Sequence, residues 1–269
     1  INNLYIPTQK ERLQKLYDIS YNQWSLEELE SGEGLNYMLN LLQNYLNWSE
    51  NELNKIDKIS SNLKYSRNKQ FTLQKTLKEI KNKNIALEFG VYKGSTINMI
   101  SKYFNKVYGF DSFESLPENW NGVCDKDRFR VDSLPIVDKN VTLIQGWFDK
   151  TLEPFFKNNN LDVDFIHIDC DLYSSTKYVF DKLIEYKKLK KGVIIIFDEI
   201  LNYNKFLEGE MKALYEISTE NNITFEWLGT HGNIIYPKDL EDENSKFNNW
   251  TFKEYRLNGY QQEAAIIIT

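Results

Sequence analysis

The sequence predicts an α/β fold, in which a doubly wound, mostly parallel sheet follows an N-terminal helical cap. Residues 1–80 are polar and helical in pattern, whereas from Ile85 onward short β-branched runs alternate with helical segments. The run Val193-Ile-Ile-Ile-Phe197 is continuously apolar, as is typical of a parallel strand covered on both faces. We therefore divide the chain into a helical region, 1–80, and an α/β domain, 81–269.

Seven runs are expected strands and four segments are expected helices. The strands are 85–88, 106–111, 141–145, 164–169, 193–198, 224–228 and 264–269, and the helices are 95–103, 151–158, 174–187 and 209–220. Strands that alternate with helices imply right-handed crossovers, and ligands of such sheets bind beyond the carboxyl ends of the strands. Polar residues stand at five of these ends, namely Glu88, Asp111, Gln145, Asp169 and Asp198. We therefore expect the functional site at that edge, beside an irregular insertion over 119–140.

The N-terminal region has the features of amphipathic helices. Ser25 and Glu28 form a capping box, and apolar residues recur at helical spacing between Leu35 and Leu46. We interpret the region as a cap packed on the main domain, with a dimerisation arm as the alternative. A homodimer is the expected assembly.

Composition restricts the classes of partner and compartment. The 269 residues include 41% hydrophobic side chains and carry a net charge of −6, which argues against a nucleic-acid backbone as partner. The only cysteines, Cys124 and Cys170, have no metal-ligand spacing and favour a reducing compartment. No apolar run reaches the length of a membrane span, and no signal peptide is visible. We expect a cytoplasmic protein acting on a small-molecule or saccharide acceptor.

A glycine turn follows the first expected strand. Gly90 and Gly94 lack the middle glycine of a dinucleotide fingerprint, and Lys93 precedes Gly94 in the wrong order for a P-loop. The spacing suits a cofactor with an amino-acid head and no phosphate, whose carboxylate meets backbone N–H groups at the start of the next helix. Asp111 ends the second strand and can accept both ribose hydroxyls. These features indicate S-adenosylmethionine; the alternative is that the glycines only form a turn and Asp111 only caps a helix.

Five blocks carry a family resemblance. They are Glu88-Phe-Gly-Val-Tyr-Lys-Gly-Ser, Gly109-Phe-Asp-Ser-Phe-Glu-Ser-Leu-Pro117, Gln145-Gly-Trp-Phe148, His167-Ile-Asp-Cys-Asp-Leu-Tyr-Ser-Ser-Thr176 and Phe197-Asp-Glu199. The chain resembles the macrocin O-methyltransferase (TylF-type) family of class I S-adenosylmethionine-dependent methyltransferases across most of the α/β domain. The resemblance implies a seven-stranded Rossmann-like methyltransferase sheet with an antiparallel last strand. It also implies methylation of a sugar hydroxyl on a saccharide, nucleotide-sugar or glycosylated natural product.

The expected cofactor site combines the glycine turn with the blocks that resemble this family. Its residues are Glu88, Phe89, Gly90, Gly94, Ser95, Thr96, Asp111, Ser112, Phe113, Gln145, Gly146, Trp147 and Asp169.

Acids at the next two strand ends are candidates for the chemistry. A sugar hydroxyl is a poor nucleophile and needs a base, a metal ion or both. Oxygen-only ligands favour Mg²⁺, and the resemblance implies metal ligands at Asp169, Asp198 and Glu199, with Glu199 standing where the family has a second Asp. The metal-free alternative makes Asp169 or Asp198 a direct base. Asp171 follows the same strand as Asp169, so it could converge with these carboxylates, and the alternative is that it caps the following helix.

The two histidines have different expected roles. His167 lies inside a strand and is interpreted as a hydrogen-bonded core residue. His231, in a glycine-flanked turn, is a candidate base or acceptor contact, and a plain loop histidine is the alternative. The catalytic candidates are therefore Asp169, Asp198 and His231. Methylation of a non-sugar small molecule and a non-catalytic cofactor-binding homologue are the competing functions.

Overall fold

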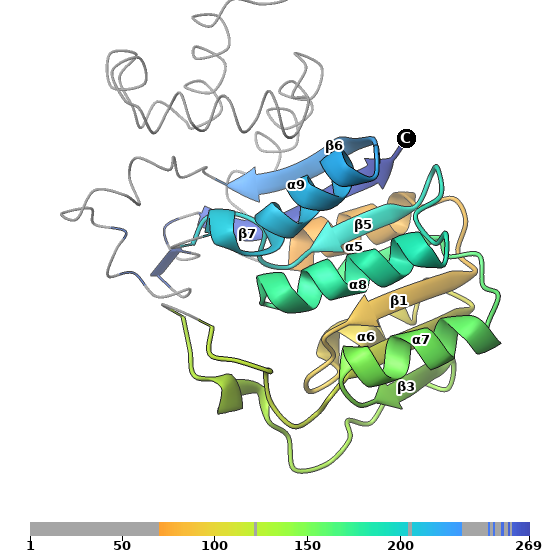
Figure 1. Ribbon diagram of the computed structural model, residues 1–269, viewed down its shortest axis with the longest axis horizontal. Coiled ribbons are helices and arrows are strands. Elements are labelled where there is room, and N and C mark those ends of the chain that lie inside the picture. Colours follow the sequence, from red (N-terminus) through yellow and green to blue (C-terminus); the bar gives the residue numbers. More distant parts are fainter. Residues whose placement is uncertain are drawn as a thin grey trace, which may run out of the picture.

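The computed structural model describes residues 70–120, 123–203, 206–232 and 260–269, with single positions at 247, 250, 254, 255 and 258. A seven-stranded sheet forms its centre, in the order β3-β2-β1-β4-β5-β7-β6 (Figure 1). The strands are β1 (Ile85–Phe89), β2 (Lys106–Asp111), β3 (Val141–Gln145), β4 (Phe165–Ile168), β5 (Ile194–Phe197), β6 (Phe225–Gly232) and β7 (Tyr260–Ile268). Strands β1 to β5 are parallel, and β7 runs antiparallel to β5 and β6. The expected fold class is confirmed, including its antiparallel last strand.

Two layers of helices cover the sheet (Figure 1). On one face lie α7 (Phe148–Asn158), α8 (Tyr173–Glu185) and α9 (Glu210–Glu220), and on the other lie α5 (Gln70–Glu79) and α6 (Ser95–Ile100). Each layer has its own apolar core, because alternate residues of a strand point to opposite faces. Phe89 and Phe110 belong to the α7–α9 core and stack with ring centroids 5.1 Å apart. Leu73 and Leu77 of α5 belong to the opposite core.

The register of β1 brings the site residues to one edge. Glu88 pairs with Gly109 of β2 and His167 of β4, one residue before these strands end their pairing with β1. The packing leaves little room for a side chain at Gly109, because a Cβ there would lie 2.3 Å from Cδ1 of Ile97 in α6. The parallel register therefore aligns the carboxyl ends of β1, β2 and β4.

The structure extends several expected elements and corrects one expected placement. Strand β6 runs to Gly232 rather than ending at Leu228, because it keeps pairing with β7 across two register shifts. His231 therefore lies in a strand, and the expected glycine-flanked turn is wrong. The helices expected in residues 1–69 lie outside the described residues. Among the described helices, none has the length and apolar character needed to cross a membrane.

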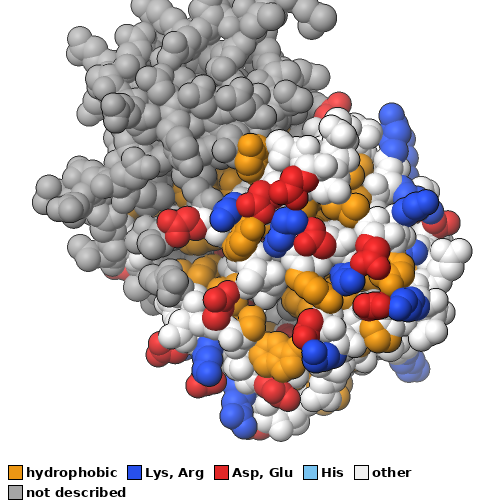
Figure 2. All heavy atoms as spheres, viewed as in Figure 1, with side chains coloured by type: hydrophobic (Ala, Val, Ile, Leu, Met, Phe, Trp, Pro, Cys, Tyr) orange, Lys and Arg blue, Asp and Glu red, His pale blue; other side chains and the backbone are white. Residues whose placement is uncertain are grey.

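The face formed by α7, α8 and α9 carries interspersed basic and acidic side chains (Figure 2). Nζ of Lys177 lies 2.7 Å from Oδ1 of Asp181, and Nζ of Lys182 lies 2.7 Å from Oε2 of Glu185. Such exposed pairs contribute little stability individually, so this face is a solvated surface of short-range ion pairs.

Candidate functional site

The turn after β1 is built around a close approach of two backbones. Gly90 has φ +92°, and its N–H donates to the Phe110 carbonyl at 2.9 Å. The Asp169 N–H donates to the Phe89 carbonyl at 2.8 Å. A Cβ at Gly90 would lie 1.8 Å from the Asp169 carbonyl oxygen. Only glycine fits here, so the turn and Asp169 are locked to each other.

Asp111 holds this turn from the end of β2. Its Oδ2 accepts hydrogen bonds from the N–H groups of Val91 and Tyr92, both at 2.8 Å, and its Oδ1 accepts one from Phe113 at 2.7 Å. An ionised carboxylate has about four acceptor positions, so three of them are already engaged. The sequence predicts that Asp111 accepts both ribose hydroxyls, whereas in this conformation one position remains for a ligand.

A loop segment covers the second glycine of the turn. Gly94, at φ +79°, precedes α6 as its N-cap, and a Cβ there would lie 3.0 Å from Cβ of Pro135. The rings of Tyr92 and Phe129 meet edge to face at 5.5 Å between centroids. Asn98 of α6 donates its side-chain amide to the Ile136 carbonyl at 2.9 Å. The insertion between β2 and β3 therefore packs on the glycine turn. Of the expected contacts in α6, Ser95 is exposed and Thr96 is half-buried.

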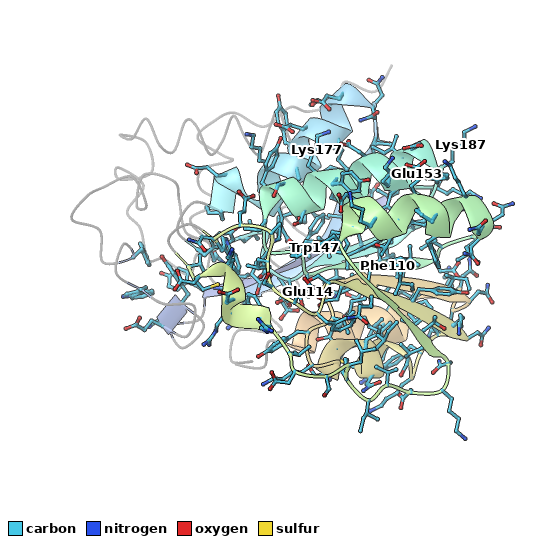
Figure 3. All side chains as sticks on the ribbon, turned by 60° about the horizontal axis from the view of Figure 1, so that its bottom comes forward. Phe110, Glu114, Trp147, Glu153, Lys177 and Lys187 are labelled. Carbon is cyan, nitrogen blue, oxygen red and sulfur yellow. The ribbon has the colours of Figure 1, made fainter. Side chains whose placement is uncertain are left out.

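The ends of β2 and β3 supply the other expected cofactor contacts. Ser112 donates its hydroxyl to the Ser115 carbonyl at 2.9 Å, so it shapes the following turn, in which Phe113 is buried at φ +60°. The Gly146 N–H donates to the Asp111 carbonyl at 2.9 Å, which ties the end of β3 to β2. Half-buried Trp147 is the N-cap of α7 (Figure 3).

Two more expected contacts differ in how a ligand reaches them. Gln145 is exposed at the end of β3. Phe89 is fully buried in the apolar core, so it offers a ligand only its backbone.

Three carboxylates converge at the ends of β4 and β5. Oxygen atoms of Asp169, Asp171 and Glu199 lie within 4.8 Å of one another, and the last two residues are buried. Asp198, the other expected ligand, is buried beside Glu199 but does not belong to this group. A set of three carboxylates with oxygen-only donors suits Mg²⁺ or a similar hard cation. The chemistry of the group therefore fits the expected metal, with Asp171 in the place given to Asp198.

Asp171 is not the N-cap of the following helix. Helix α8 begins at Tyr173 and its N-cap is Leu172, whose side chain makes no capping hydrogen bond. Asp171 itself has φ +62°, a left-handed conformation that aspartate tolerates better than most residues. The Asp-x-Asp spacing after a buried strand is the sequence signal for its convergence with Asp169.

Burial and negative charge dominate the electrostatics of this edge. The pKa of Glu88 is raised well above its usual value by burial, then by Asp198 and Asp111. Burial raises the pKa of Tyr203 well above its usual value, and Glu210 and Glu199 add to the effect. A bound cation would relieve this concentration of charge.

Asn202 has a structural role near this edge, and the side chain of one catalytic candidate is not placed. Asn202 donates its amide to the Gln261 carbonyl at 2.6 Å, which ties the end of β5 to β7. The side chain of His231 lies outside the described residues. The structure therefore brings Glu88, Gly90, Asp111 and Asp169 together at one edge and leaves His231 a prediction.

The segment that contains these site residues is similar to a known protein family. Residues 87–200 match a family model described as a methyltransferase domain. The matched segment begins in β1 and ends just after β5, so it contains the glycine turn, Asp111 and the three carboxylates. A search of curated proteins gave no match.

Several solved structures resemble the chain at low identity. The calicheamicin methyltransferase CalS11 is 18% identical with a TM-score of 0.45, over 82% of this chain and 90% of its own. The apo structure of CalS11, named a TDP-rhamnose 3′-O-methyltransferase, is 19% identical with a TM-score of 0.42 over the same 82% and 90%. SMU.1697c from Streptococcus mutans, solved with SAH, is 13% identical with a TM-score of 0.41, over 74% of this chain and 96% of its own. Similarities this distant do not indicate a substrate.

Proposed function

We propose that this protein is an S-adenosylmethionine-dependent O-methyltransferase that acts on a sugar hydroxyl. The observation that carries the proposal is the methyltransferase-domain match over residues 87–200, which contains both the glycine turn and the group Asp169, Asp171 and Glu199. The TylF-type sequence blocks support the choice of a sugar acceptor.

The cofactor would be held by the edge of β1, β2 and β3. Asp111 would offer its remaining acceptor position to a ribose hydroxyl. The turn after Gly90 lies beside it, because two N–H groups of that turn donate to the Asp111 carboxylate. Trp147 and Phe113 are the aromatic residues proposed to enclose the adenine, which stacks well on aromatic rings. When bound, S-adenosylmethionine supplies the methyl group that is transferred to the acceptor oxygen.

The acceptor would lie beyond β4 and β5. Asp169, Asp171 and Glu199 would hold Mg²⁺, which supplies a positive charge that lowers the pKa of a bound hydroxyl. Asp198, which is buried and precedes Glu199 in the chain, would receive the hydroxyl proton as general base. The residues thereby position and deprotonate the acceptor, and positioning alone can supply much of the rate of a displacement reaction.

Replacing Asp111 by asparagine tests the cofactor site. We expect the affinity for adenosylhomocysteine, measured by titration calorimetry, to fall at least about tenfold in Asp111→Asn, because an amide cannot accept on its nitrogen. Asp164→Asn is the matched control. Asp164 also accepts two backbone N–H groups, at 2.8 and 3.2 Å, but at the start of β1. Absence of binding by the wild-type protein would refute the proposed function.

Removal of one carboxylate tests the metal site. Mn²⁺ binding, followed by electron paramagnetic resonance, is expected to weaken at least about tenfold in Asp171→Asn, because one of three charged ligands is lost. Asp181→Asn is the control, since Asp181 is paired with Lys177 on α8, away from the group. Unchanged Mn²⁺ affinity in Asp171→Asn contradicts this ligand set, and full activity in EDTA leaves Asp169 or Asp198 as a direct base.

The class of acceptor needs a separate experiment. Incubation with labelled S-adenosylmethionine and panels of saccharides, nucleotide-sugars and phenols, followed by product mapping, distinguishes the candidates. Label found only on phenolic oxygens would replace the sugar by an aromatic acceptor. Cofactor binding without turnover on any panel member would favour a non-catalytic homologue.

A further inference from the structure

A buried acid–imidazole pair links the first and fourth strands. Glu88 and His167 are register partners in β1 and β4, and their side chains are 0% and 1% exposed. Oε1 of Glu88 lies 3.0 Å from Nδ1 of His167. Glu88 lies two residues before Gly90, and His167 lies two residues before Asp169.

The second oxygen of Glu88 has a different environment. Oε2 is buried and has no hydrogen-bond partner among the described residues. A buried carboxylate oxygen left in this state is costly, and a ligand that donates to it offsets the cost. The carboxylates that act on Glu88 are Asp198 and Asp111, so a positively charged donor fits the position best.

We propose that His167 is a positioning residue, which holds Oε1 of Glu88 so that Oε2 receives the ammonium group of the cofactor's amino-acid end. This inference rests on the proposed function, because it takes the cofactor to be S-adenosylmethionine. His167 does not touch the ligand and acts only through Glu88.

The mechanics follow from side-chain torsions. The terminal torsion of glutamate is broad, so a free carboxylate samples many orientations. The backbone of His167 is held by pairing with Glu88 in β1 and with Ile196 in β5, and its ring is buried. A hydrogen bond from a fixed ring therefore selects one orientation of the carboxylate before the ligand arrives, which reduces the entropy lost on binding.

Two ligands separate this role from a purely structural one. Adenosylhomocysteine carries the amino-acid end, whereas 5′-methylthioadenosine keeps the adenosine and sulfur but lacks it. In His167→Leu and His167→Gln, we expect affinity for adenosylhomocysteine to fall about ten- to hundredfold, with methylthioadenosine affinity changed less than about threefold. His167→Asn places an amide nitrogen near the position of Nδ1 and is expected to restore binding of adenosylhomocysteine.

Titration calorimetry of the full chain measures both affinities, and thermal unfolding checks each variant. The comparison of the Asn with the Gln variant carries the test even where His167→Leu does not fold. Equal losses for the two ligands, or no loss for either, overturn the positioning role while the proposed function stands. Failure of the wild-type protein to bind adenosylhomocysteine overturns the proposed function instead. In a double-mutant cycle with Glu88→Gln, additive losses also overturn the inference, because residues that act through one another are not additive.

Discussion

Gly90→Ala is expected to destabilise the protein by about 4 kcal/mol, since two separate penalties add. The residue has φ +92°, which L side chains rarely adopt. Its new Cβ would also lie 1.8 Å from the Asp169 carbonyl oxygen, an atom of the backbone that cannot rotate away. The ends of β1 and β4 must separate to admit the methyl group. Urea unfolding measures the change in free energy.

Gly192→Ala is the matched control for this substitution. Gly192 has nearly the same backbone conformation, φ +94°, but nothing lies within 4 Å of the position that a Cβ would take there. Gly192→Ala should therefore destabilise the protein only through its backbone conformation, by about 1–2 kcal/mol. Equal losses at the two glycines would show that the close approach to Asp169 contributes nothing.

Glu88→Gln is expected to make the protein more stable than wild type at alkaline pH, because it removes a buried carboxyl group whose ionisation is opposed by burial. The pKa of Glu88 is raised in the folded state by burial, Asp198 and Asp111. Its stabilising contribution is therefore complete below the unfolded pKa and is lost as the pH rises through the folded pKa. The wild-type protein should lose stability over that range, and the variant should lose less.

The measurement is the free energy of unfolding from about pH 4 to pH 9, compared between wild type and variant. The difference should be small at the acidic end and grow with pH. Glu114→Gln is the matched control, because it makes the same change at an exposed position. A variant that is less stable than wild type at pH 9 would contradict the direction assigned to the Glu88 pKa.

Local patterns in the sequence were sufficient for the sheet. β2 and β3 lie where their apolar runs predict them, at Lys106–Asp111 and Val141–Gln145. The length of β6 was not predictable in this way, because its last residues are held by pairing with β7. Such long-range pairing leaves little signal in the strand itself.

The site shows a similar division between local and long-range information. The glycine turn and Asp111 follow from spacing along the chain, but the three N–H groups bound to Asp111 depend on how the turn folds back. The sequence left two roles open for Asp171, because aspartate before a helix is often a cap. The left-handed backbone at Asp171, which the sequence does not reveal, accompanies the convergence of its carboxylate with those of Asp169 and Glu199.

The position of β7 has a consequence for synthesis of the chain. β7 follows every other strand in sequence, yet it lies between β5 and β6 and is hydrogen-bonded to both. While a ribosome is still making residues 260–268, β6 has no route into the sheet and one edge of β5 is open. Unpaired strand edges of this kind are templates for aggregation. Until β7 has been made, this edge of β5 is therefore open to pairing with another chain.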